Sequence, residues 1–176
     1  CICLSTGKKF LGKFKTKKTN CLYIDYENNH FIIKERLERF RKAHKLKKIK
    51  NLYFLTREQH FDILSLGFIC SLENAIEKYN IGYIVIDTLP KATNYDSNSE
   101  KAVNEIYTKF FLPFIEKYGM SITFLLHTNK SGTSFIGSQA YLGIVDCSYE
   151  ITKKKGTNKI KVRSDNRNSN IEFGVE

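Results

Sequence analysis

The stretch IGYIVIDTL, residues 81–89, decides the fold, because four consecutive apolar residues in it lead directly into Asp87. An apolar run with almost no alternation is typical of a central strand that is covered on both faces of a parallel sheet. The residues that follow, 89–99, are polar and predict a segment that does not pack. This segment is too short for a linker between domains, so we interpret it as a mobile loop of a site.

Strand-like and helix-like segments alternate around this central strand. Apolar runs predict further strands over residues 21–27, 51–56 and 121–130, the last of them buried. The N-caps that we expect for the intervening helices are Asn28 or Asn29, Ser71, and Ser97 in a capping box with Glu100. Pro113 is expected to kink the last turns of the third helix.

The end of the chain is richer in strands. Residues 147–152 and 158–164 predict a hairpin that turns around Lys155 and Gly156. Together with the alternating segments, this pattern predicts an α/β fold: a mostly parallel sheet flanked by helices, with a C-terminal antiparallel hairpin extension.

Length and charge limit the classes of protein to consider. The 176 residues fit one globular domain, and the formal net charge of +11 favours a polyanionic partner, nucleic acid first. The alternative is that the lysines reflect an AT-rich genome and are simply solvated. Five scattered cysteines, no secretory signal and no apolar run near 18 residues indicate a reduced, soluble, cytoplasmic protein without membrane segments.

Polar side chains follow three of the predicted strands, at the point where each strand ends. They are Asp25 and Glu27, then Asp87 and Thr88, then His127 and Thr128. Any one of these residues alone is an ordinary turn or rim residue. Because ligands of open parallel sheets bind beyond the carboxyl ends of the strands, their repetition favours a site at this edge.

The residue types at this edge suit nucleotide hydrolysis. An aspartate on a rigid strand, here Asp87, can hold Mg²⁺ and its water shell near phosphates. A glutamate on the neighbouring strand, here Glu27, can orient the attacking water. Phosphoryl transfer mainly requires such positioning and charge compensation.

The stretches CLYIDYEN, YIVIDTL and FLLHTNKSG…GSQA, in this order, resemble the RecA-like ATPase core. The resemblance is specifically to the RepA-type hexameric helicase branch of the AAA-family ATPases, with KaiC and RadA-type recombinases as more distant relatives. The resemblance covers residues 6–150. It implies one RecA-like ATPase domain over residues 1–176, with ATP and Mg²⁺ as cofactors, self-association into a ring or filament, and single-stranded DNA as a partner in replication or repair.

The resemblance also implies roles for individual residues. Asp87 matches the Walker B aspartate and metal ligand, with Thr88 beside it at the nucleotide, and Glu27 matches the catalytic glutamate. His127 and Thr128 match the polar sensor of the γ-phosphate, and Gly137, Ser138 and Ala140 match the GSxA turn. Lys161 and Arg163 match basic fingers that reach the γ-phosphate of a neighbouring subunit. The loops expected to grip DNA contain Lys91, Asn129, Lys130 and Ser131.

The sequence departs from the family in one important respect, because no G-x-x-x-x-G-K-[ST] phosphate-binding loop occurs in it. Family order would place this loop just before Cys1. The chain either has lost it by truncation or is a degenerate member that binds ATP weakly. The absence of an initiating Met and the apolar start at residues 1–4 favour truncation, and the 176 residues as given should bind nucleotide weakly.

Two other functions remain open. The chain could be a non-hydrolysing RecA-fold paralogue that binds nucleic acid or a partner ATPase through its basic surface. It could also be a nuclease that holds two Mg²⁺ ions between Asp25, Glu27 and Asp87. The nuclease is the weaker alternative, because it leaves His127 and the GSxA turn without a role.

Overall fold

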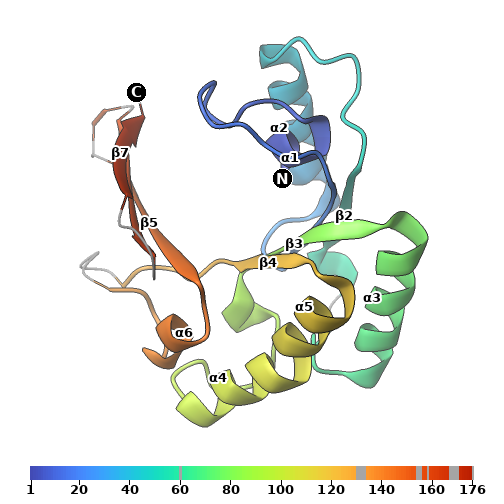
Figure 1. Cartoon of the computed structure of the whole chain (residues 1–176), viewed down its shortest axis with the longest axis vertical. Helices are drawn as coiled ribbons and strands as arrows, with labels where there is room; N and C mark the ends of the chain where they lie inside the picture. Colours follow the sequence, from blue (N-terminus) through green and yellow to red (C-terminus); the bar gives the residue numbers. More distant parts are fainter. Residues whose placement is uncertain (60, 130–133, 154–155, 158, 167–170, 176) are drawn as a thin grey trace. The chain divides into compact units, whose positions relative to one another are not determined.

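The computed structural model of the chain divides into two compact units, Cys1–Gly137 and Ser138–Glu176 (Figure 1). The structure describes all residues except 60, 130–133, 154–155, 158, 167–170 and 176. Among the described residues, none of the helices has the length and apolar character needed to cross a bilayer.

The first unit is built on a four-stranded sheet in which all neighbours run parallel. Its strands stand in the order β2-β1-β3-β4, which are Leu52–Thr56, Asn20–Asp25, Ile81–Asp87 and Ser121–Phe124. The central strand β3 carries the quoted apolar run, and Ile84 and Ile86 are completely buried. The predicted α/β sheet is therefore confirmed, with β3 inside it.

Helices cover both faces of this sheet, as Figure 1 shows with the strands seen nearly edge-on. On one face lie α1 (Ile2–Thr6) and α2 (His30–Ala43). On the other lie α3 (Leu66–Tyr79), α4 (Glu100–Ile106) and α5 (Leu112–Tyr118). The unit thus has three layers, and short 3₁₀ turns at Arg57–Gln59 and Leu89–Lys91 follow β2 and β3.

Two of the expected helix starts are wrong. α3 begins at Leu66, because Ser65 accepts a hydrogen bond from the Phe68 amide at 3.3 Å, whereas Ser71 lies inside the helix and donates to the Gly67 carbonyl. α4 is capped by Ser99, which accepts from the Ala102 amide, and not by Ser97. In both cases, the serine that follows an Asp turn is the one placed for capping.

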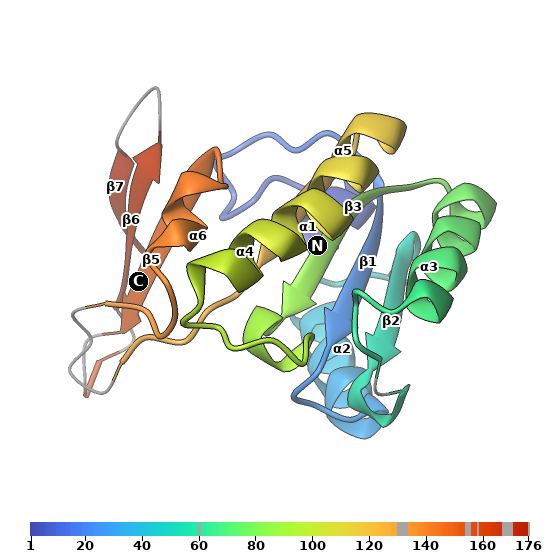
Figure 2. The same cartoon turned by 90° about the horizontal axis from the view of Figure 1, so that it is seen from below.

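A π-helical segment lies just before Pro113, where we expected a kink. Five residues, Tyr107–Phe111, wind as a π-helix between α4 and α5, and the three pieces form one continuous rod in Figure 2. A proline lacks an N–H and collides with the carbonyl four residues earlier, so a wider turn just before it relieves the clash. Val103, Phe110 and Phe114 of this rod are all buried.

The fourth strand is not the buried strand that we expected. β4 spans only Ser121–Phe124, its residues alternate between exposed and half-buried, and Leu125 is exposed. Among the described strands it pairs with β3 alone, so it forms an edge of the sheet. The pairing continues irregularly, since the Leu125 amide donates to the Ile86 carbonyl and the Leu89 amide donates to the Leu125 carbonyl.

The second unit holds the short helix α6 (Ala140–Gly143) and an antiparallel sheet. Strands β5 (Cys147–Lys153) and β6 (Ile160–Asn166) form the predicted hairpin, with Gly156 in its turn at φ 75° and Lys155 outside the described residues. A third strand, β7 (Ile171–Val175), pairs with β6 and was not expected from the sequence.

Candidate functional site

The carboxyl ends of β1 and β3 meet at one edge of the parallel sheet. In the register of the strands, Asp25 lies opposite Thr56 of β2 on one side and opposite Asp87 of β3 on the other. The Tyr26 amide then donates to the Asp87 carbonyl at 2.7 Å. Asp25 of β1 and Asp87 of β3, which we expected at one site, are therefore adjacent, as the pairing of parallel strands requires.

Asp25 is a structural residue of this edge. Its side chain is 1% exposed and its Oδ1 accepts hydrogen bonds from the backbone amides of Glu27 and Asn28, at 2.8 and 2.7 Å. The Asn28 side-chain amide adds contacts to both carboxylate oxygens. These bonds fold the chain into a tight turn after β1, and the turn fixes where Glu27 leaves the sheet.

Glu27 is held by two side chains from other parts of the chain. Lys91 Nζ, which follows β3, and His127 Nε2, which follows β4, both lie 2.9 Å from Glu27 Oε1. A carboxylate can only accept, so the His127 Nε2 carries the proton of this hydrogen bond. The hydrogen bonds from His127 and then Lys91 lower the pKa of Glu27, so this carboxyl stays ionised at neutral pH.

Asp87 lies in a less favourable environment for charge. Burial raises the pKa of its carboxyl, and the nearby Asp25 and Glu27 act in the same direction. A hydrogen bond from the Tyr23 hydroxyl to Asp87 Oδ2, 2.6 Å long, opposes this shift. A carboxylate with this balance is stabilised when a cation arrives, which is the behaviour expected of a metal ligand.

The segment after Asp87 is better packed than we expected from its composition. Thr88, Leu89 and Ala92 are buried, and the Ile63 amide donates to the Ala92 carbonyl at 2.9 Å. Farther on, Asn94 donates to the Asp62 carboxylate through its backbone and its side chain. The peptide bond between Asp87 and Thr88 is cis. We expected residues 89–99 not to pack. This expectation is wrong for the first half of the segment, because the side chains of Leu89 and Ala92 are buried.

The chain after β4 turns back on itself. Thr128 is exposed and forms an isolated antiparallel bridge with Phe135, while the Asn129 amide donates to the Ser134 carbonyl at 2.8 Å. The Ile136 amide donates to the His127 carbonyl at 2.7 Å, which closes the base of this turn beside the site. Lys130 and Ser131, expected in the same loop, lie outside the described residues.

The residues of the expected GSxA turn and of the expected basic fingers occupy the end of the chain. Gly137 has φ 125°, a conformation that favours glycine, and Ser138 Oγ accepts from the Ala140 amide at 3.2 Å. Lys161 and Arg163 are exposed on β6, where they lie opposite Thr152 and Glu150 of β5. They belong to the second unit, and the edge of the parallel sheet belongs to the first.

The donor groups of the edge fit one divalent cation shared with phosphates better than a dedicated metal cage. Among the described residues, no three His, Cys, Asp or Glu side chains gather in a way that could hold a metal. Asp25 is already used by backbone amides, and Glu27 by Lys91 and His127. Of the three acids at this edge, Asp87 is the one whose surroundings favour an added positive charge.

The first unit is thus a three-layered α/β core with acidic groups at the carboxyl ends of its two middle strands. The AAA domain family model matches residues 1–133, and the chain therefore belongs to this family. A solved structure with the same fold is a KaiC-like protein from the hyperthermophilic archaeon Pyrococcus horikoshii OT3, at 15% identity and a TM-score of 0.60. The match covers 90% of this chain and 71% of that one. A search of curated proteins found no match.

Three contacts of the site were not foreseen from the sequence: Lys91 on Glu27, Tyr23 on Asp87, and Asp25 as the acceptor of the turn. A signal existed for Tyr23, because residues two apart on a strand share a face and Asp25 is paired with Asp87. No comparable signal pointed to Lys91, which we had assigned to a DNA-binding loop. Its position depends on how the segment after β3 folds back.

Proposed function

We propose that this protein is an ATP-hydrolysing, RecA-like ATPase that couples hydrolysis to DNA binding or unwinding. The observation that carries the proposal is the meeting of Glu27, Asp87 and His127 at one edge of the sheet, in a chain of the AAA domain family. These three residues come from segments that follow different strands. Their convergence supports a shared site more strongly than any one of the motifs does.

In this proposal Glu27 orients the attacking water. Its ionised carboxylate accepts a hydrogen bond from the water, and its lowered pKa favours positioning over complete removal of a proton. His127 and Lys91 hold the carboxylate in place. Because both contact Glu27 directly, they are also the groups through which a bound γ-phosphate would act on the loops that follow β3 and β4.

Asp87 would hold Mg²⁺ at the phosphates, with Thr88 beside it, and the bound ion would neutralise charge that develops on them. Tyr23 fixes the orientation of the Asp87 carboxylate through its hydroxyl. Thr128 would act with His127 as the polar sensor. Lys161 and Arg163 would supply positive charge to the γ-phosphate of a neighbouring subunit, in a ring or filament of single ATPase domains.

Single-stranded DNA is the proposed polymer substrate. The loops expected to contact it carry Lys91, Asn129, Lys130 and Ser131, of which Lys91 contacts Glu27 in the present arrangement. A lysine shared in this way could report DNA engagement to the carboxylate that orients water. The match to the AAA domain family does not identify a helicase, so helicase activity is also a proposal.

The test is phosphate release from Mg-ATP by the full-length protein with and without oligo(dT). Glu27→Gln and Asp87→Asn should each lower kcat by about 100-fold or more, since positioned acid–base and charge-stabilising groups contribute at least that much. Glu35→Gln and Glu116→Gln, at exposed carboxylates of α2 and α5 outside the site, are the matched controls and should retain activity. Unchanged activity in both site variants would refute the proposal.

One observation favours a second candidate function. The formal net charge of +11 suits the binding of a polyanion, which requires no hydrolysis. A non-hydrolysing paralogue would bind nucleic acid or a partner ATPase through its fold alone. It would show no phosphate release in the wild type, while nucleic-acid binding would persist in Glu27→Gln and Asp87→Asn.

The nuclease has less support, because Asp25 already accepts hydrogen bonds from the backbone amides of the turn after β1.

A further inference from the structure

The positive charge of this protein is concentrated in two segments. Residues 8–18 contain six lysines and residues 42–50 contain five, and neither segment contains an acid. The remaining 18 Lys and Arg residues equal the 18 Asp and Glu residues in number, so these two segments account for the whole formal net charge of +11. An AT-rich composition alone would spread the lysines more evenly.

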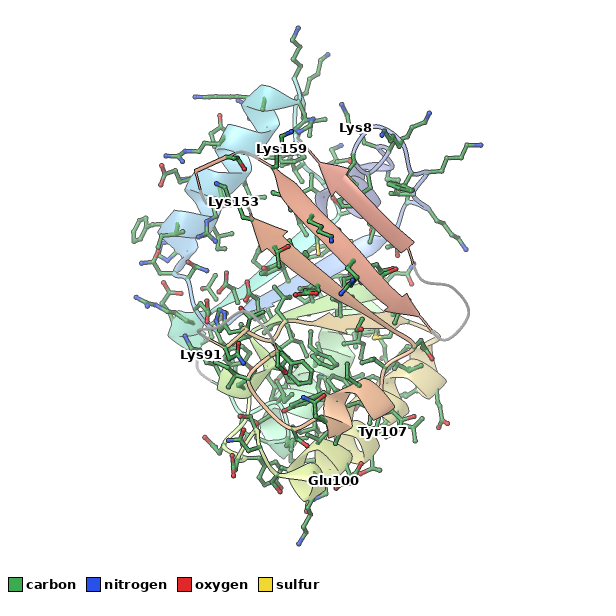
Figure 3. The ribbon with its side chains drawn as sticks, turned by 90° about the vertical axis from the view of Figure 1, so that its left-hand side faces the viewer. Lys8, Lys91, Glu100, Tyr107, Lys153 and Lys159 are labelled. Atoms are coloured by element: carbon green, nitrogen blue, oxygen red, sulfur yellow. The ribbon has the colours of Figure 1, made fainter. Side chains whose placement is uncertain are left out.

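The two segments approach the same region of the first unit. Each leads into the amino end of one of two neighbouring parallel strands, β1 and β2. Lys8 Nζ donates to the His44 carbonyl at 3.3 Å and joins them directly. Figures 1 and 3 show the loop that carries Lys8 and the C-terminal end of α2 at the same end of this unit. The site residues follow the opposite, carboxyl ends of the strands.

Residues 8–18 form a structured hairpin rather than a loose connection. The Phe10 and Phe14 backbones exchange two hydrogen bonds, of 2.8 and 3.0 Å, and Leu11 and Gly12 both have positive φ in the turn between them. Thr16 Oγ1 donates to the Lys8 carbonyl at 2.8 Å and closes the base. The side chains at the tip are therefore presented in a fixed arrangement, which lowers the entropy cost of binding.

Aromatic and basic side chains alternate on this hairpin. Phe10 and Phe14 are 49% and 45% exposed, and their ring centroids lie 6.3 Å apart. All eleven lysines of the two segments are exposed. Among the described residues, only Lys42 has a carboxylate within 4.0 Å, that of Glu38. Large exposed apolar rings surrounded by lysines, ten of which have no carboxylate within 4.0 Å among the described residues, indicate a binding function.

We propose that residues 8–18 and 42–50 form a binding surface for single-stranded nucleic acid, separate from the loops at the catalytic edge. Lysines would contact the phosphates, and the exposed face of Phe10 would stack on a base. Basic grooves that carry aromatic platforms bind single strands in this way, because every base offers a π-face. The proposal deepens the DNA part of the proposed function and requires neither ATP nor an intact ATPase site.

Single-stranded nucleic acid fits better than the two other polyanions. Bases of a duplex are stacked on each other and offer no free face to Phe10. A membrane surface would favour an amphipathic helix with a continuous apolar face. Here the exposed large apolar side chains of the two segments, Phe10, Leu11 and Phe14, all lie on a short hairpin, and the lysines extend onto the second segment. Duplex DNA and anionic vesicles are therefore the competitors to test.

The experiment measures fluorescence anisotropy of labelled oligo(dT) with the full-length protein, without nucleotide, over a range of salt concentrations. The pairs Lys13→Glu/Lys15→Glu and Lys47→Glu/Lys48→Glu should each weaken binding by about tenfold or more. Each should also reduce the slope of log K against log salt by about 0.7 per lost phosphate contact. Phe10→Ala should weaken binding by about tenfold with the slope unchanged, because it removes stacking and not charge.

The matched control is Lys34→Glu/Lys101→Glu, which makes the same charge change at exposed lysines outside the two segments. If it weakens binding as much as the segment pairs do, only net charge matters and the proposed surface is refuted. Equal or tighter binding to duplex DNA or to phosphatidylserine vesicles, or no effect of Phe10→Ala, would also overturn it. Because binding is measured without nucleotide, the result can be interpreted even if the protein releases no phosphate from ATP.

Discussion

At the scale of single residues, two aspartates at the same edge of the sheet have different tasks. Asp25 and Asp87 are paired in the register of β1 and β3, yet Asp25 is enclosed by amide donors and Asp87 by a tyrosine hydroxyl and two other acids. Backbone amides satisfy the Asp25 charge within the fold. The Asp87 carboxylate would be stabilised by an added positive charge. For this reason Asp25 is a residue of the turn, whereas Asp87 is the proposed cation ligand.

Glu27 gives a prediction about stability and pH. Its pKa is lowered in the folded chain, so folding favours the ionised form. The stabilisation is then fully present above the unfolded-state pKa of about 4.3 and is lost as the pH falls through the lower folded-state value. Glu27→Gln should reduce the free energy of unfolding at neutral pH by up to about 1 kcal/mol, a small effect because its partners are solvent-exposed.

Urea unfolding of both proteins across the acid range measures this difference. It should shrink toward zero at pH values below the folded-state pKa. Glu116→Gln, at an exposed carboxylate with no basic group within 4.0 Å among the described residues, should show no such pH-dependent difference. Equal stability of Glu27→Gln and wild type at every pH would mean that His127 and Lys91 do not stabilise the carboxylate.

At the scale of elements, the strands were easier to predict than the helix ends. β1 and β3 are buried on both faces, and burial of that kind leaves a continuous apolar run in the sequence. A helix start depends on one serine side chain, and both Ser65 and Ser71 precede a suitable pattern. The turn at Asp62, which places Ser65, is a tertiary feature held by Asn94 from a distant segment. No local pattern contains that information.

The two serines can be distinguished by mutation. Ser65→Ala should destabilise the protein by about 1 kcal/mol, because the Phe68 amide at the start of α3 loses its acceptor. That loss corresponds to a melting temperature lower by roughly 2–4 °C. Ser71→Ala should change stability by less than about 0.5 kcal/mol, because its hydroxyl only contacts a carbonyl inside the helix. Thermal unfolding followed by circular dichroism measures both, and equal losses would contradict the cap assignment.

At the scale of the whole molecule, topology explains what could be predicted of the site. Parallel strands place their carboxyl ends at one edge, so Glu27, Asp87 and His127 could be grouped without knowledge of the structure. The direct contact between His127 and Glu27, and the position of Lys91 between the segments, depend on distances between parts of the chain far apart in sequence. The strand β7 was missed for a related reason, because five residues pair only when β6 is already in place.

The proposed ring assembly predicts that two inactive variants can restore activity when they are mixed. If Arg163 completes the site of a neighbouring subunit, then Arg163→Ala and Glu27→Gln are each inactive alone but lack different halves of an interface. Mixed assemblies of the two would restore an intact interface wherever an Arg163→Ala subunit receives the arginine of a Glu27→Gln subunit. With random mixing, about a quarter of the interfaces of a head-to-tail ring should regain ATPase activity. Mixtures of Glu27→Gln with Asp87→Asn, which damage the same half of the interface, should stay inactive. A site shared between subunits would be excluded if this control mixture regained activity, or if the mixture of Arg163→Ala with Glu27→Gln did not.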